Sequence, residues 1–137
     1  MEKYLEELLK LSKKAYQKSE IPVGCIIVHK NIIVARAYNL RETKKDVLGH
    51  AEIIAIKQAN LKMNNWRLTD CDMYVTLAPC KMWQAVIEEA RLKKVYYLLE
   101  NQNVGSQNKN HKYQKINNCE YEENYIKTFK KMFQKLR

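Results

Sequence analysis

Residues 50–61 read HAEIIAIKQANL and residues 78–83 read APCKMW, and these two stretches decide the fold of the chain. The first puts His50 and Glu52 at the start of a helical pattern that is apolar on most sides. The second puts Cys80 directly after Pro79, where a strand pattern ends and a helical one begins. Histidine and cysteine are metal ligands, and a neighbouring carboxylate can carry protons. The pattern therefore predicts a metal-assisted hydrolytic site at the starts of two helices.

One ligand of that site is missing from the sequence. Residue 83 lies at i+3 from Cys80, on the same face of the predicted helix, where a second thiolate would complete a three-ligand zinc site. The residue there is Trp83. An indole offers an N–H donor and no lone pair for a metal. His50 and Cys80 are thus the two clear metal ligands, and Glu52 is the predicted general acid/base.

Composition limits the class of protein. A chain of 137 residues with 46% apolar residues predicts one globular domain over residues 1–137. No apolar run approaches the roughly 20 residues of a membrane span, and the chain opens directly into a helical pattern, so we expect a soluble, cytoplasmic protein with no membrane contact. The four cysteines are widely spaced, which argues against a disulfide framework.

The formal net charge is +10, from 25 Lys and Arg against 15 Asp and Glu. This excess suits a polyanionic partner such as a nucleic acid. The bases are mostly lysine and asparagine is also abundant, which an A/T-rich genome produces without selection for nucleic-acid binding. Charge alone therefore leaves both explanations open.

Periodicity predicts an α/β fold, a three-layer helix–sheet–helix domain with a mixed five-stranded sheet. Residues 23–28 and 32–38 read as strands joined by a turn at 29–31, and Met82 and Ala85 are expected on the inner side of the helix that follows Cys80. Residues 100–118 have little apolar content and read as a loop, and the fifth strand would lie between the strand at 95–99 and the last helix. The expected helices cover residues 4–16, 50–61, 81–91 and 121–137, and the remaining expected strands cover 73–77 and 95–99.

On these motifs the chain resembles the bacterial tRNA-specific adenosine deaminases, of the zinc-dependent cytidine deaminase superfamily. The matching segments are Ile21-Pro22-Val23-Gly24, Asn39, His50-Ala51-Glu52, Arg67-Leu68-Thr69-Asp70, Tyr74-Val75-Thr76-Leu77, Pro79-Cys80 and the basic end of the chain. The resemblance covers nearly the whole length. It implies a cytidine deaminase-like fold, a zinc cofactor and a homodimer that converts adenosine to inosine at the wobble position of tRNA.

The resemblance also implies roles for individual residues. Asn39 would hold the nucleoside. The basic C-terminal helix, residues 121–137, would grip the anticodon stem-loop of the tRNA. The other residues implied to bind substrate are Ile21, Pro22, Val23, Gly24, Ala51 and Pro79, and those implied to bind RNA are Lys127, Lys130, Lys131 and Lys135.

The chain departs from the family pattern at four places. Trp83 replaces a zinc cysteine, and Ala78 replaces a glutamate usual before Pro-Cys. Val47-Leu48-Gly49 replaces a more regular Pro-Thr-Ala, and the segment between Leu99 and Tyr121 is shorter. The first departure bears on catalysis and the last on substrate contacts.

Several alternatives stay open at this point. The chain could be a non-catalytic tRNA-binding subunit of the same fold, or a deaminase of small nucleobases or nucleotides, although a small substrate needs no basic helix. Cys25 could supply a substitute thiolate or simply pack in a strand. Asn39 could be a plain turn residue. The lysines of the last helix could be an ordinary solvated face.

Overall fold

A five-stranded mixed sheet forms the centre of the molecule in the computed structural model, which describes residues 1–101 and 112–135. The strands run in the order β2-β1-β3-β4-β5 across the sheet. Their bounds are β1 Gly24–His29, β2 Ile32–Tyr38, β3 Cys71–Leu77, β4 Lys94–Leu99 and β5 Tyr113–Lys115. β1 is antiparallel to both β2 and β3, whereas β3, β4 and β5 are mutually parallel.

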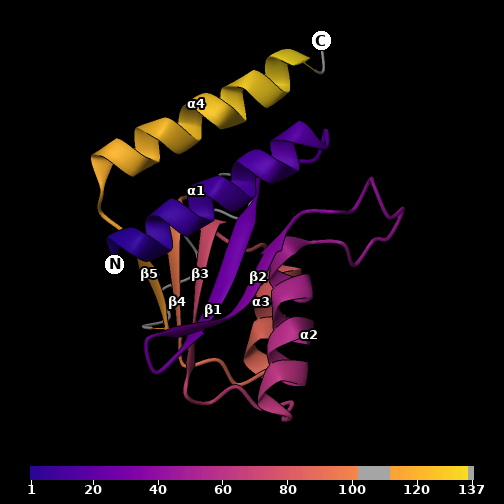
Figure 1. Ribbon diagram of the computed structural model, residues 1–137, viewed down its shortest axis with the longest axis vertical. Coiled ribbons are helices and arrows are strands. Elements are labelled where there is room, and N and C mark those ends of the chain that lie inside the picture. The colour runs from indigo at the N-terminus through magenta and orange to yellow at the C-terminus, as the bar shows by residue number, and fades with distance from the viewer. Residues whose placement is uncertain (102–111, 136–137) are drawn as a thin grey trace.

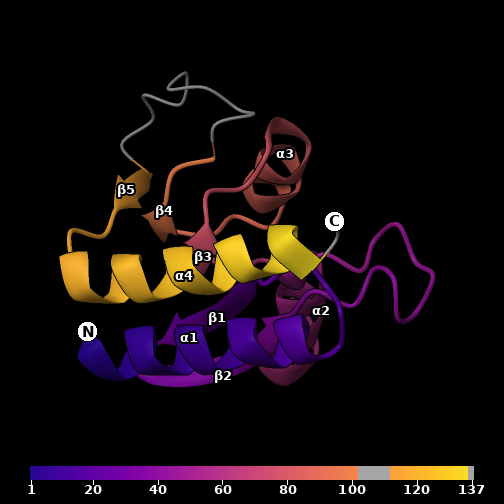
Figure 2. The ribbon, with the colours of Figure 1, turned by 90° about the horizontal axis from the view of Figure 1, so that it is seen from above.

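Helices cover both faces of this sheet (Figure 1). One face carries α1 and α4, which run side by side in the same direction (Figure 2). The other face carries α2 and α3. The helix bounds are α1 Glu2–Gln17, α2 Ala51–Met63, α3 Lys81–Glu89 and α4 Cys119–Lys135. The three-layer helix–sheet–helix architecture with a mixed five-stranded sheet is confirmed.

The turn between β1 and β2 shows how sequence sets local structure here. Lys30 and Asn31 both have positive φ angles, 49° and 65°. Two successive residues of that kind form the hairpin turn whose twist matches that of the flanking strands, and asparagine tolerates this conformation. The predicted hairpin at residues 29–31 is therefore confirmed.

One apolar core lies on each side of the sheet. The core under α2 and α3 contains fully buried aliphatic residues of the central strands, among them Ile27, Val75 and Val95. The core under α1 and α4 contains Leu5 and Leu8 of α1 together with Tyr125 of α4. The alternating strand side chains therefore supply both cores. None of the described helices is both long enough and apolar enough to span a bilayer.

The structure corrects one prediction about α3. Met82 is 67% exposed and Ala85 is exposed, whereas Trp83 and Ile87 are buried. Residues i and i+4 share a helix face, so burying the indole of Trp83 turns Met82 outward. The helix also ends at Glu89 rather than at 91.

The expected loop at 100–118 contains one short strand. β5 spans Tyr113–Lys115 and pairs with β4 in parallel, so its place in the sheet comes from pairing rather than from apolar content. Residues 102–111 of that segment lie outside the described residues.

A buried carboxylate joins the end of α1 to the loop before α2. Glu20 is 1% exposed. It accepts hydrogen bonds from the backbone N–H groups of Glu42 and Thr43, and from the Thr43 hydroxyl. These three bonds satisfy the charge of the buried group and hold the loop against the body of the domain.

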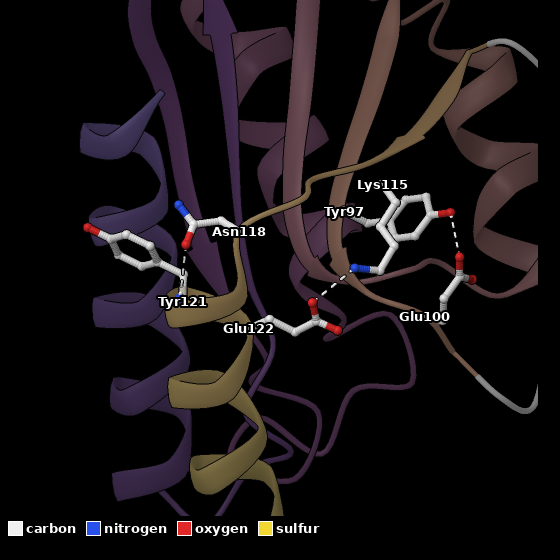
Figure 3. A network of polar contacts seen from close by, with 6 residues as sticks. All are labelled: Tyr97, Glu100, Lys115, Asn118, Tyr121 and Glu122. Atoms are coloured by element: carbon white, nitrogen blue, oxygen red, sulfur yellow. Dashed lines mark hydrogen bonds and ion pairs between the residues drawn. The ribbon is translucent and has the colours of Figure 1, made fainter.

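Polar contacts also fix the start of α4 (Figure 3). Asn118 Oδ1 accepts from the backbone N–H of Tyr121 at 3.3 Å, as a helix-capping side chain does. Lys115 of β5 forms an ion pair with Glu122 of α4 at 3.1 Å. These contacts tie the sheet edge to α4, which is the helix that reaches the pocket described next.

Candidate active site

A cavity of about 800 Å³ opens where β3 and β4 end. In sheets of this kind, ligands bind outside the carboxyl ends of the parallel strands. The starts of α2 and α3 supply polar groups, and α4 closes one side. The lining residues are Ile21, Val23, Asn39, His50, Glu52, Leu77, Ala78, Cys80, Trp83, Leu99, Glu100, Asn101, Ile126, Phe129 and Lys130.

One part of the lining of this cavity, formed by Asn39 and Glu52, is called the polar wall below. Asn39 is 5% exposed and follows β2 directly. Its Oδ1 accepts from the backbone N–H of Ala51 at 2.8 Å. The N-terminal N–H groups of a helix need such acceptors, and the N-cap residue His50 makes no side-chain capping bond. Because the oxygen of Asn39 is occupied in this way, its NH₂ group is the end that remains for a ligand.

Glu52 is the second polar group of this wall. It lies in the first turn of α2 and is 4% exposed. Burial raises the pKa of its carboxyl group from 4.5 to about 7, although a backbone hydrogen bond acts in the opposite direction. A carboxyl group with this pKa exists in both forms at neutral pH, and it can therefore accept a proton and return it.

A second part of the lining, formed by His50, Cys80 and Trp83, is called the aromatic corner below. His50 and Cys80 are the N-cap residues of α2 and α3, so two helix starts bring them to the same cavity. Burial, and secondarily the charge of Arg41, lower the pKa of His50. Its imidazole is therefore neutral at pH 7 and keeps a lone pair.

Trp83 completes the aromatic corner. The indole is 7% exposed, and its ring centroid lies 4.6 Å from that of His50, with 45° between the ring planes. This is a tilted aromatic contact within the range that stabilises ring pairs. The residue predicted to stand in a ligand position thus packs on the histidine that would be a ligand.

The aromatic corner does not fit a zinc ion. A catalytic zinc site needs three protein ligands and an open fourth position. Across residues 1–101 and 112–135, no three His, Cys, Asp or Glu side chains form a group that could hold a metal. Cys25 does not complete the set, because it is fully buried in the core under α2 and α3, and burial raises the pKa of its thiol well above the usual value.

The residues of the first-strand motif divide into two groups. Ile21 and Val23 line the cavity. Pro22 and Gly24 are not among the described lining residues, and neither are Ala51 and Pro79. A Cβ atom on Gly24 would come within 2.7 Å of a backbone oxygen of α1, so this glycine lets the helix approach the strand. A substrate role for these six residues stays a prediction.

The sequence did not reveal that α4 lines the cavity. Ile126 and Phe129 were expected only on the apolar side of an amphipathic helix, and they border the pocket. The ring of Phe129 also contacts that of Tyr125, with centroids 5.9 Å apart. Helix docking depends on tertiary packing, and spacing within one helix carries no signal for it.

Three of the four predicted RNA-binding lysines are described with their side chains. Lys127, Lys130 and Lys131 are exposed on α4, and Lys130 also borders the cavity. The side chain of Lys135 lies outside the described part of the chain. Glu100 also lines the cavity, and its carboxylate accepts from the Tyr97 hydroxyl at 2.9 Å (Figure 3).

Solved structures share this fold. A structure from biochemical and structural studies of A-to-I editing by tRNA:A34 deaminases at the wobble position of transfer RNA aligns with a TM-score of 0.81 and 28% identity, over 93% of this chain and 99% of the other. The X-ray structure of guanine deaminase from Bacillus subtilis aligns with a TM-score of 0.68 and 33% identity, over 72% of this chain and 64% of the other. The fold is therefore that of nucleobase deaminases.

The chain belongs to the family described as the cytidine and deoxycytidylate deaminase zinc-binding region, which matches residues 1–99. It is 42% identical over 102 residues to a tRNA-specific adenosine deaminase of Streptococcus pyogenes, and 41% identical over 96 residues to that of Bacillus subtilis. These alignments cover 74% and 70% of this chain, but 64% and 60% of the relatives. The chain thus spans about three fifths of the length of these relatives.

Proposed function

We propose that this chain acts on adenosine in tRNA, as an adenosine deaminase that converts the wobble adenosine of an anticodon stem-loop to inosine. The observation that carries the proposal is the polar wall, where a buried Asn39 and a buried Glu52 face one cavity. The names of the relatives from Streptococcus pyogenes and Bacillus subtilis support the same substrate. Exposed Lys127, Lys130 and Lys131 on the helix beside the cavity support a polyanionic partner.

The reaction would begin with an extruded base. A deaminase cannot reach its target atom inside a stacked strand, so the base turns out of the stack into the pocket. The Asn39 NH₂ group would donate hydrogen bonds to acceptor atoms of the nucleoside and so orient it. Water adds to C6 of adenine and ammonia leaves, which gives inosine.

Glu52 would carry the protons of this reaction. It would accept a proton from the attacking water and deliver a proton to the departing amine, so that no net proton is consumed at Glu52. Its pKa of about 7 suits both directions at neutral pH. In the family, zinc supplies the activated water, but the aromatic corner has only two donor side chains for it. The cavity therefore holds the side chains proposed to bind the base, but only two of the three ligands that a catalytic zinc ion needs.

A second candidate follows from that imbalance. A non-catalytic subunit that binds tRNA would keep the cavity and the basic helix and would not need a third ligand. The burial of Trp83 against His50 favours it. The retention of Glu52, a buried carboxyl group that costs stability, favours the deaminase instead. A deaminase of small nucleobases is disfavoured because such a substrate has no use for the lysines of α4.

Inosine formation under single-turnover conditions tests the proposal. The substrate is an anticodon stem-loop with adenosine at the wobble position, and the control substrate carries guanosine there. Inosine formed from the first RNA by the unaltered chain supports a deaminase, and inosine formed only after Trp83→Cys shows that the rest of the deaminase site is intact. Tight binding of the stem-loop with no inosine from either protein supports the non-catalytic subunit.

The same resemblance leads us to propose a homodimer that works in the cytoplasm, where tRNA is modified. Light scattering at several protein concentrations measures the oligomeric state directly. A mass of one chain throughout would remove the dimer from the proposal.

A further inference from the structure

The place where a third metal ligand would stand is filled by a ring that packs like a core residue. Trp83 is 7% exposed, and its neighbour in the cavity is His50, at 4.6 Å between ring centroids. An indole held in this way is rigid, because burial and ring contact leave it few rotamers. A rigid, flat, apolar surface at the end of a cavity is suited to a flat ligand.

The other surfaces of the cavity are also suited to a base rather than to an ion. Leu77 and Leu99 come from the ends of β3 and β4, and Phe129 comes from α4. Asn39 lines the same cavity, and its NH₂ group is available for a hydrogen bond to the edge of a ring. Lys130 at the rim offers a positive charge for a phosphate attached to that ring.

We propose that Trp83 converts the metal position of this fold into a stacking wall, so that the pocket binds the purine base of an unpaired nucleotide without a metal ion. The inference rests on the proposed function for the identity of the base, adenine. It goes beyond that function because the pocket would bind the base without help from a metal ion. Stacking of a base on an aromatic side chain changes affinity by about 10-fold to 100-fold, which is enough to measure.

The chain provides a clean spectroscopic probe for this binding. It has two tryptophans, Trp66 and Trp83. Trp66 is 52% exposed and lies under the guanidinium of Arg67, and it does not border the cavity. The variant Trp66→Phe therefore leaves the fluorescence of Trp83 alone to report on the pocket.

The experiment titrates the Trp66→Phe chain with adenosine 5′-monophosphate, once after dialysis against EDTA and once with added zinc chloride. We expect saturable quenching of Trp83 with dissociation constants that agree within about twofold, because the metal has no part in the contact. Trp83→Phe, which keeps an aromatic ring, is expected to lose only a few-fold in affinity by calorimetry. Trp83→Ala is expected to lose about 10-fold to 100-fold.

Two results would overturn the inference. One is a loss of more than about tenfold in affinity when EDTA removes metal, which would mean that an ion takes part in binding. The other is unchanged affinity in a folded Trp83→Ala chain, with thermal melting as the test of folding. If the alanine variant does not fold, the comparison of affinity in EDTA and in zinc with the Trp66→Phe chain still tests the inference.

The outcomes also separate this inference from the proposed function. Metal-free binding of the nucleotide, with no inosine from the chain or from Trp83→Cys, would refute the deaminase and leave the stacking wall standing. Inosine from Trp83→Cys, with no nucleotide binding by the unaltered chain in EDTA, would support the deaminase and refute the stacking wall.

Discussion

Asn39 and Glu52 on the polar wall are buried polar groups, and the burial of each costs free energy that an apolar side chain would not cost. Trp83 in the aromatic corner is a buried apolar ring, and it is stabilised by packing on His50. The two parts of the cavity lining therefore differ in how their burial affects stability. The polar wall has the groups that would recognise a base and carry protons in the proposed function, whereas the aromatic corner has the packing of a core and lacks a third metal ligand. We expect from this difference that base binding and hydrolysis depend on different parts of the cavity and can be altered separately.

The largest effect is expected from restoring a ligand in the aromatic corner. Trp83→Cys adds a thiolate beside His50 and Cys80, so zinc content should rise to about one ion per chain and inosine formation should rise with it, since a bound zinc ion lowers the pKa of water from 15.7 to about 7. Mass spectrometry of the metal and single-turnover assays measure both. Trp83→Ala is the matched control, because it removes the indole without adding a donor. Full zinc occupancy in the unaltered chain would contradict the comparison.

The next effect tests the polar wall. In the Trp83→Cys background, Glu52→Ala should lower inosine formation by about 10³-fold, because it removes the group that carries protons. Binding of the anticodon stem-loop should stay within about twofold, since Glu52 is not a ligand of the RNA backbone. Unchanged turnover would remove Glu52 from the mechanism.

Glu52 should also make stability depend on pH. Its carboxyl pKa is about 7 in the folded chain and 4.5 ordinarily, so the folded chain holds a proton that the unfolded chain has released between these values. The stability is fully present below pH 4.5 and falls as pH rises through 7, by about 3 kcal/mol. Urea unfolding in EDTA at pH 5 and pH 8 measures this fall. Glu52→Gln should not show it, and an equal fall in that variant would assign the pH dependence to other groups.

Asn39 should contribute to stability as well as to recognition. Asn39→Ala removes the acceptor of the Ala51 N–H and should cost about 1–2 kcal/mol in the free energy of unfolding. Asn39→Asp keeps an oxygen for the helix but removes the NH₂ donor. That variant should therefore fold nearly as well as the unaltered chain and bind adenosine 5′-monophosphate more weakly. Equal binding by Asn39→Asp would show that the amide donor has no part in recognition.

The smallest effect is expected outside both walls, on α4. Changing Lys127, Lys130, Lys131 and Lys135 to glutamine should flatten the log–log dependence of stem-loop affinity on salt, by about 0.7 to 0.9 for each phosphate that a lysine no longer neutralises. Thermal stability should not change, because the described lysines of this group are exposed. A matched set of four lysines on α1, Lys3, Lys10, Lys13 and Lys14, is the control. An unchanged slope would make α4 a solvated face only.

The sequence was sufficient to predict the residues that local chemistry singles out. His50, Glu52 and Cys80 stand in a spacing that places them at helix starts, and the structure brings them to one cavity with Asn39. The order of predicted strands and helices was also sufficient to predict the three-layer helix–sheet–helix architecture. Local pattern could not predict how helices rotate and dock, so the burial of Trp83 in place of Met82 and the contact of Phe129 with the cavity came only from the structure. A fifth strand was expected before the last helix, but its position at Tyr113–Lys115 came only from the structure, because pairing with β4 rather than composition holds it.

The clamp that Glu20 forms has a consequence for hydrogen exchange. Glu42 and Thr43 belong to an exposed loop, and amide hydrogens in such loops ordinarily exchange within seconds because local opening costs almost nothing. Here their N–H groups donate to a carboxylate that is 1% exposed. Exchange at these two amides requires the carboxylate to release its partners inside the domain, so they should exchange together with the end of α1 rather than with the surrounding loop. We therefore expect these two residues of a surface loop to open only when the neighbouring core opens.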